Sequence, residues 1–182
     1  FGYDPERAVD LMRKAREAGE IPEIRFETQN STVSRQMAEA VVSDLRRIGL
    51  TVRTIVNTWP QMQERIARKQ AQFFMAAWQA DYPDPENFLS LLYGGNASPG
   101  TNHANFRNAG YDRLYERMRD LPDGPDRLAL IRQMVRIVHE ETPWVFFNHR
   151  IAYGVRQAWL RNLKPAPIAP GMFQYLDIDP EE

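Results

Sequence analysis

The sequence contains no cysteine among its 182 residues. This absence excludes disulfides, thiolate catalysis and cysteine metal sites. The sequence also has little net charge, because 23 Lys and Arg residues stand against 24 Asp and Glu residues. A nearly neutral chain has no overall field that would attract nucleic acid or an anionic membrane, so local groups must recognise any ligand. We therefore expect no nucleic-acid partner.

Long hydrophobic runs are missing as well, since no stretch approaches the roughly 18 apolar residues needed to span a bilayer. The first five residues, FGYDP, contain neither an initiator Met nor a signal-peptide pattern. We therefore expect the sequence to have been cut from a longer one. Its 43% hydrophobic content is sufficient for one well-buried core without metal or disulfide support.

The first half of the sequence alternates between strand and helix patterns. Predicted strands cover residues 24–28, 51–57 and 73–78, and predicted helices cover residues 33–48 and a stretch that begins at Trp59 and Pro60. The third strand is an uninterrupted apolar run, which is typical of a strand covered on both faces. Strands separated by helices predict an α/β fold with a mainly parallel sheet flanked by helices.

The second half is predicted to be more helical. Apolar residues at helical spacing indicate two further helix faces, and apolar runs at residues 144–147 and 151–155 suggest late strands. The first face contains Leu114, Met118 and Leu121, and the second contains Leu128, Ile131, Val135 and Val138. We find no internal repeat or linker, so a single α/β domain over residues 1–182 is the expectation.

A binding site is expected where the parallel strands end, because open α/β sheets bind ligands outside the carboxyl ends of their strands. The loops at these ends contain Trp59, Trp78 and Asp81. Two amphipathic rings and one carboxylate on a common rim would form a cradle for a small molecule. Core or lid packing is the simpler interpretation of each tryptophan taken alone.

The acids near the third strand are predicted to have different roles. Asp84-Pro85-Glu86 has the chemistry of a helix start, with an acceptor, a proline and an acid in sequence, and the helix is expected to continue to Gly94. Asp84 is therefore predicted to be a structural N-cap. Asp81 has no comparable local role in its Tyr-Pro turn, and we predict that it contacts the ligand.

Two other classes of function remain open at this point. A hydrolase would pair Asp81 with Asp84 or Glu86 as acid and base, whereas an interaction module would use the tryptophans to bind a protein partner. The three histidines, His103, His139 and His149, do not have metal-ligand spacing. We therefore predict neither a metal site nor a cofactor.

The segment from Trp78 to Leu89, WQADYPDPENFL, resembles the signature of the peptide, nickel and opine type of solute-binding proteins of ABC importers, known as family 5. Residues 3–8, 45–50, 111–114 and 141–144 agree with the same family. The resemblance covers most of the chain. One position departs from it, because the family commonly has Gly where this sequence has Ala77.

The resemblance implies a periplasmic-binding-protein-like lobe of type II, the C-terminal lobe of a two-lobed clamp whose N-terminal lobe is absent. Such a clamp encloses a small solute, which is a peptide, opine, oligosaccharide or metal chelate, and delivers it to the transmembrane subunits of an ABC permease without chemistry. The implied protein is periplasmic or otherwise extracytoplasmic, with a lipid anchor left open, and we expect a monomer.

The resemblance also implies roles for individual residues. The acid matching Asp81 receives the α-amino group of a peptide, and aromatic residues matching Trp59 and Trp78 line the pockets. The predicted ligand-binding residues are therefore Trp59, Trp78, Asp81 and Tyr82. Peptide import is the expected function, and the enzyme alternative is not favoured.

Overall fold

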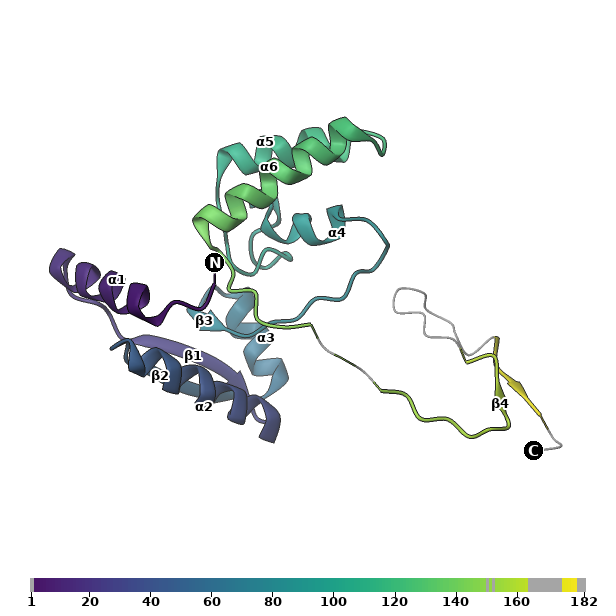
Figure 1. Ribbon diagram of the computed structural model, residues 1–182, viewed down its shortest axis with the longest axis horizontal. Coiled ribbons are helices and arrows are strands. Elements are labelled where there is room, and N and C mark those ends of the chain that lie inside the picture. The colour runs from purple at the N-terminus through teal and green to yellow at the C-terminus, as the bar shows by residue number, and fades with distance from the viewer. Residues whose placement is uncertain (1, 150, 152, 164–174, 180–182) are drawn as a thin grey trace. The chain divides into compact units, whose positions relative to one another are not determined.

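The computed structural model describes residues 2–149, 151, 153–163 and 175–179. The chain divides into two compact units, whose elements are labelled in Figure 1. The first unit comprises Phe1–Ala77 and Ser98–Asn105, and the second comprises Trp78–Ala97 and Phe106–Glu182. The expectation that both belong to one lobe stays a prediction.

A three-stranded parallel sheet forms the centre of the first unit (Figure 1). Its strands are β1 (Ile24–Gln29), β2 (Val52–Asn57) and β3 (Phe73–Phe74), in the order β2-β1-β3. Strands β1 and β2 pair in register along their whole length, whereas β3 pairs with β1 only at Phe26 and Glu27. The α/β class and the parallel sheet are thus confirmed.

Three helices accompany this sheet: α1 (Pro5–Ala18), α2 (Thr32–Arg47) and α3 (Trp59–Ala67). Side chains before α1 and α2 satisfy backbone amides that have no partner inside a helix. The Asp4 carboxylate accepts from the Arg7 N–H at 2.9 Å, and the Ser31 hydroxyl accepts from the Ser34 N–H at 3.1 Å. The predicted start of the third helix at Trp59 is also confirmed.

The two faces of β1 are buried against different helices, because successive strand residues point to opposite faces. Phe26 is fully buried and packs with Ala38 and other apolar residues of α2. Glu27 is also fully buried, and its carboxylate accepts from Arg65 of α3 at 2.7 Å and from Asn57 of β2 at 2.6 Å. A buried carboxylate requires such partners, so α3 is held to its sheet by a polar contact.

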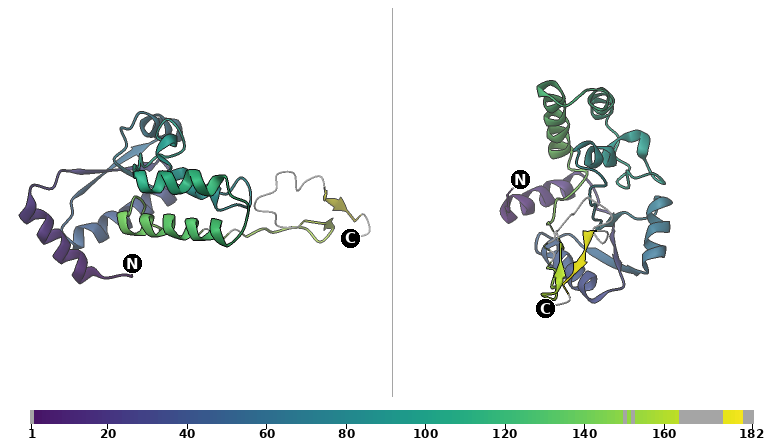
Figure 2. Two further views of the ribbon diagram at one scale, coloured as in Figure 1. Left: turned by 90° about the horizontal axis from the view of Figure 1, so that it is seen from above. Right: turned by 90° about the vertical axis from the view of Figure 1, so that its right-hand side faces the viewer.

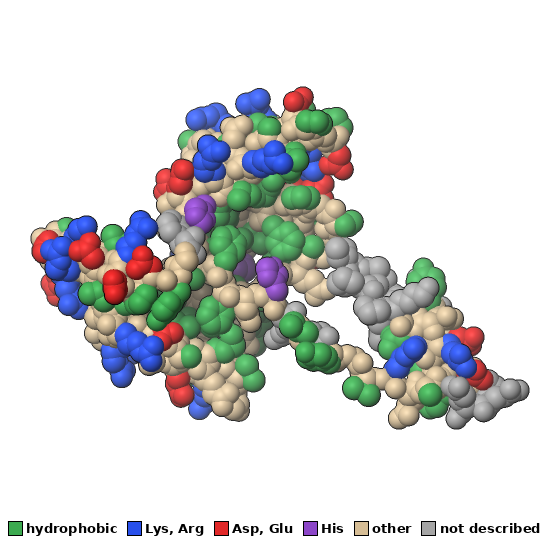
Figure 3. All heavy atoms as spheres, in the orientation of Figure 1, with side chains coloured by type: hydrophobic (Ala, Val, Ile, Leu, Met, Phe, Trp, Pro, Cys, Tyr) green, Lys and Arg blue, Asp and Glu red, His purple; other side chains and the backbone are tan. Residues whose placement is uncertain are grey.

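Exposed charges of both signs cover α1. Asp10 forms ion pairs with Arg13 and Lys14, which lie three and four positions after it, both at 2.7 Å. Figure 3 shows the same mixture of acidic and basic side chains on this helix. Exposed pairs of this kind contribute little stability, so α1 depends on its cap and its apolar residues.

The second unit is mainly helical. It contains α4 (Glu86–Leu89), the 3-10 helices η1 (Ser90–Leu92) and η2 (Gly94–Asn96), α5 (Ala109–Arg119), α6 (Pro125–Glu141) and the short antiparallel pair β4 (Leu160–Arg161) and β5 (Asp177–Ile178). Helices α5 and α6 lie side by side, as Figure 2 shows. The single helix expected from residue 84 to Gly94 is therefore replaced by one short α-helix and two 3-10 turns.

The core of this unit includes residues from α4, η1, α5 and α6. Its buried members are Leu89, Leu92, Tyr111, Tyr115, Met118, Leu130, Met134 and Val138. The predicted inner face of α6 was wrong at two positions, since Leu128 and Val135 are 45% and 53% exposed. Leu130 and Met134 take their place, because the helix presents positions 127, 130, 134 and 138 to its neighbours.

Three predicted strand segments differ from the structure. Only Phe73–Phe74 forms a strand in the apolar run 73–78, because the pairing with β1 ends after Phe74. In the described parts of 144–147 and 151–155 there is no strand. Val145 and Val155 are 79% and 99% exposed there. An apolar run favours burial of its side chains, but a strand also requires a neighbouring backbone that pairs with it through hydrogen bonds.

Two adjacent substitutions test the observed inner face of α6. Met134 is fully buried, so Met134→Ala should lower the free energy of unfolding by about 2–5 kcal/mol. Val135→Ala should change it by no more than about 0.5 kcal/mol, because that side chain is already half exposed. Urea denaturation followed by circular dichroism measures both. A larger loss for Val135→Ala would contradict the observed face.

Candidate functional site

Three residues of the second unit form a connected polar cluster, which we call the Asn87 cluster: Trp78, Asp81 and Asn87. The Trp78 indole N–H donates to the side-chain oxygen of Asn87 at 2.7 Å. The backbone N–H of Asp81 donates to the same oxygen at 3.2 Å, and the Asn87 amide nitrogen donates to the Asp81 carboxylate at 3.2 Å. Asn87 thus joins two of the predicted ligand-binding residues.

The members of the Asn87 cluster differ sharply in burial. Asn87 is only 4% exposed, whereas Trp78 is 40% exposed and Asp81 is also exposed. Among the described residues, no Lys, Arg or His forms an ion pair with Asp81. The cluster therefore exposes a carboxylate and part of an indole ring to solvent, and the buried amide of Asn87 supports both.

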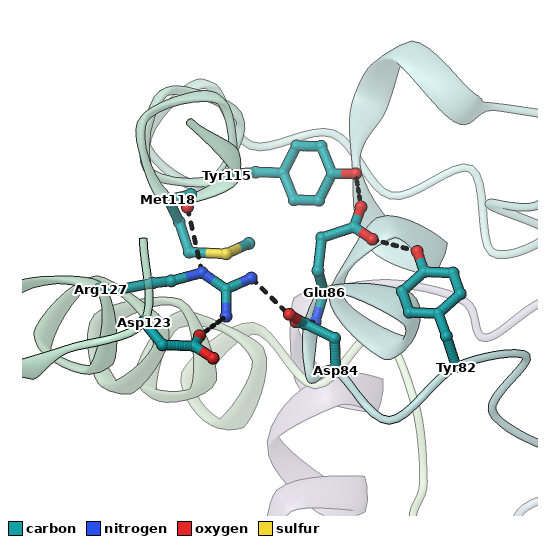
Figure 4. A network of polar contacts seen from close by, with 7 residues as sticks. All are labelled: Tyr82, Asp84, Glu86, Tyr115, Met118, Asp123 and Arg127. Carbon is teal, nitrogen blue, oxygen red and sulfur yellow. Dashed lines mark hydrogen bonds and ion pairs between the residues drawn. The ribbon is translucent and has the colours of Figure 1, made fainter. Parts of the chain in front are cut away.

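Asp84 lies in a different environment. Its carboxylate accepts from the backbone N–H of Glu86 at 2.7 Å and from the guanidinium of Arg127 at 2.8 Å. Arg127 is 7% exposed and also donates to Asp123 at 2.8 Å, as Figure 4 shows. Helix α4 itself begins at Glu86, with Pro85 in the capping position. Asp84 thus connects the start of α4 to α6.

The Glu86 carboxylate accepts hydrogen bonds from two tyrosines. The hydroxyls of Tyr82 and Tyr115 both donate to its carboxylate, from opposite sides in Figure 4. Tyr115 lies on α5 and is buried, while Tyr82 is 44% exposed. The hydrogen bond to Glu86 raises the pKa of Tyr82, and burial followed by the same carboxylate raises the pKa of Tyr115. Both phenols therefore remain protonated donors at neutral pH.

The hydrogen bonds of Asp84 and Glu86 bear on the hydrolase alternative. That alternative requires a second carboxyl group near Asp81 that exchanges protons with a substrate. Arg127 lowers the pKa of Asp84, mainly by hydrogen bonding, and Glu86 already accepts from two tyrosines. Both acids are thus engaged in holding the structure together. In the described part of the chain, no group of three His, Asp or Glu residues could hold a metal ion.

Trp59 belongs to the first unit. It is the first residue of α3, directly after β2, and it is 56% exposed. The backbone N–H of Thr58 donates to the Gln61 side chain at 2.9 Å, which fixes the helix start beside the ring. Trp59 thus lies at the carboxyl end of a strand, as expected. Its convergence with Trp78 and Asp81, which lie in the other unit, stays a prediction.

Sequence reasoning missed Asn87. The sequence offers one indication of its burial: Asn87 is a polar residue directly before the apolar pair Phe88 and Leu89. A buried asparagine requires hydrogen-bond partners, but its partners lie six and nine positions earlier in an irregular segment. No period of a helix or strand relates these positions, so the contact could not be derived from spacing.

None of the helices in the described ranges is both long and apolar enough to cross a membrane.

Comparison with known proteins identifies the class to which this fold and site belong. Residues 1–100 match the model of the bacterial extracellular solute-binding proteins, family 5 Middle. The match covers more than half of the chain. The chain therefore belongs to this family of solute-binding proteins.

Individual relatives agree with this class. Over 97% of its length the chain is 28% identical to di/tripeptide-binding protein 2 of Pseudomonas aeruginosa, and over 98% it is 26% identical to heme-binding protein A of Haemophilus influenzae. It covers 34% of each of these proteins. The chain thus spans about a third of the length of the curated relatives it matches.

A solved structure extends the agreement to the fold. The chain is similar to the ABC transporter-associated periplasmic binding protein DppA of Helicobacter pylori, in complex with the peptide STSA, with a TM-score of 0.72 and 26% identity. The similarity covers 80% of this chain and 28% of that one. The periplasmic-binding-protein-like fold expected from the resemblance is confirmed.

The Asp84–Arg127 ion pair leads to a pH-dependent prediction. Because the pKa of Asp84 is lowered in the folded state, its contribution to stability is complete above the unfolded pKa of about 3.9 and is lost as the pH falls through the folded value. Asp84→Asn should therefore flatten the loss of stability below about pH 4. Thermal unfolding between pH 7 and pH 2.5 measures this slope.

Asp123→Asn is the matched control for that experiment. Asp123 contacts the same guanidinium but its side chain is 91% exposed, so its removal should change the acid slope much less. Equal slopes for wild type and Asp84→Asn would show that the ion pair does not stabilise the fold.

Proposed function

We propose that the chain is the C-terminal lobe of a solute-binding protein that serves an ABC importer and takes up peptides or peptide-like solutes. Family membership supports the class, and the names of the relatives support the solute, since they include di/tripeptide-binding proteins. The heme-binding relative indicates that related chains serve other solutes. The protein binds its solute and releases it unchanged to the permease.

The observation that carries this proposal is the exposed carboxylate of Asp81, for which the described ranges provide no cationic partner. Asp84, three residues later, has a buried cationic partner, while Asp81 is exposed and forms no ion pair among the described residues. A carboxylate that the fold leaves without a cation suits the α-amino group of a peptide. Asp81 is therefore proposed as the electrostatic anchor of the solute.

The aromatic residues are proposed to add apolar contact area. Trp78 and Tyr82 are partly exposed, and each has its polar atom engaged by a neighbour, Asn87 and Glu86 respectively. Their ring faces therefore remain for the solute while their polar atoms are satisfied. Trp59 is proposed as a third aromatic contact, on the basis of its exposed position after β2.

The partners and the location follow from the class. The proposed partners are a small solute and the transmembrane subunits of an ABC permease, and the protein acts as an extracytoplasmic monomer. In the relatives two thirds of the length lie outside the part matched here, which leaves room for a second lobe that closes over the solute. Enclosure removes water and strengthens the contact with Asp81.

Calorimetry with dipeptides on the full-length protein tests the anchor. Asp81→Asn should weaken binding by about ten- to a hundredfold, because a hydrogen bond to a charged group contributes roughly 1.5–3 kcal/mol. Asp84→Asn should weaken it much less, since one oxygen of Asp84 accepts from both the Glu86 N–H and Arg127, and the side-chain oxygen of asparagine can accept from both as well.

An N-acetylated dipeptide is the matched control ligand. Acetylation removes the cation, so wild type should bind this ligand about as weakly as Asp81→Asn binds the free dipeptide. Undiminished affinity of Asp81→Asn would overturn the anchor. Catalytic cleavage of the dipeptides, detected by mass spectrometry, would instead support the hydrolase alternative.

A further inference from the structure

Asn87 uses both ends of its side-chain amide. The oxygen accepts from the Trp78 indole N–H and the Asp81 backbone N–H, and the nitrogen donates to the Asp81 carboxylate. These three contacts determine the orientation of the amide. A flipped amide would place its nitrogen against two N–H donors and its oxygen against a carboxylate.

No other side chain of similar size replaces asparagine here. Aspartate would keep the two acceptor contacts but would set a second carboxylate against Asp81. Leucine would leave the indole N–H and the Asp81 N–H without partners in a site where Asn87 is 4% exposed. The position requires an acceptor and a donor on one planar group.

Two tyrosines hold Asn87 in place from α5. The Tyr111 hydroxyl donates to the backbone oxygen of Leu89 at 2.7 Å, and the Tyr115 hydroxyl donates to Glu86. Both tyrosines are buried, and the residues they contact lie on either side of Asn87 in α4. The amide is therefore carried by a helix that is itself attached to the core.

We infer that Asn87 is a positioning residue that fixes Trp78 and Asp81 relative to each other for solute recognition. This inference rests on the proposed function. The amide occupies one carboxylate oxygen of Asp81, and within the described ranges no side chain forms a hydrogen bond or ion pair with the other. One oxygen is thereby held and the other is left for the cation of the solute.

The consequence is a fixed spacing between an anionic and an aromatic contact. One buried amide sets both, because its nitrogen holds the carboxylate of Asp81 and its oxygen holds the indole N–H of Trp78. Such preorganisation lowers the ordering cost of binding. It favours solutes whose cation and apolar group are separated by a matching distance, as in a peptide with a free amino terminus and an apolar first side chain.

The contact itself is tested without any ligand. In protein labelled with nitrogen-15 at tryptophan, Trp78→Phe assigns the Trp78 indole resonance. Asn87→Ala should shift that resonance and accelerate its exchange with water, because the hydrogen bond is lost. Asn96→Ala is the matched control, since Asn96 bonds to Ser90 in the same unit and should leave the resonance unchanged. An unmoved resonance in Asn87→Ala would overturn the inference.

Asn87→Asp preserves the volume of the side chain. It keeps the oxygen that accepts from Trp78 but removes the nitrogen that donates to Asp81. Its carboxylate still accepts the indole N–H, so the Trp78 resonance should stay near its wild-type position. Two adjacent carboxylates titrate as a coupled pair, so one of the two carboxyl pKa values should be raised. Carbon-13 detected titration of the carboxyl groups measures this. Independent titration of the carboxyl groups at positions 81 and 87 would contradict the contact.

A double-mutant cycle with a dipeptide tests the link to recognition. Asn87→Ala should weaken binding by about tenfold in the wild-type background, which is about 1.4 kcal/mol, and by much less when Asp81 is already asparagine. Equal losses in both backgrounds would indicate a general structural role and overturn the inference. If wild type binds no dipeptide, the proposed function fails, and the indole and carboxyl spectra alone decide whether Asn87 positions the two groups.

Discussion

The ion pair between Asp84 and Arg127 is the constraint on which the site depends. Arg127 is buried, so its charge requires an acceptor, and Asp84 supplies one at 2.8 Å while also accepting the Glu86 N–H. This double contact determines where α4 begins. Asn87 follows within the first turn of that helix, so the position of its amide, and through it those of Trp78 and Asp81, depends on the contact that Asp84 makes with Arg127 of α6.

Asp81 and Asp84 have different roles although only two residues separate them. Arg127 hydrogen bonds to Asp84 and lowers its pKa, so Asp84 is a structural anion at neutral pH. In the part of the chain that the structure describes, the Asp81 carboxylate contacts the neutral amide of Asn87 and no cation, and Asp81 is exposed to water. The difference comes from the surroundings, because both residues have the same chemistry. The Asp81 oxygen that Asn87 does not engage is the one proposed to contact a ligand.

The sequence predicted the first unit well because its signals are local. The alternating strands and the helix that follows each of the first two depend on residues close together in the chain. The motif from Trp78 to Leu89 identified the family, which the comparisons confirm. The inner face of α6 was misjudged, because Leu128 and Val135 fit a helical stripe as well as Leu130 and Met134 do. Asn87 was missed because its contacts follow no period.

Burial also distinguishes the Asn87 amide from the Asp81 carboxylate. The amide of Asn87 is buried and hydrogen bonded, whereas the Asp81 carboxylate is exposed to water. Two unit charges about 4 Å apart attract by roughly 1 kcal/mol in water and by about 4 kcal/mol at an effective dielectric constant of 20. The anchor would therefore hold its solute weakly when the site is open and firmly when water is excluded. If the chain binds its solute as proposed, capture and release require this difference, and an exposed charge on a buried support provides it.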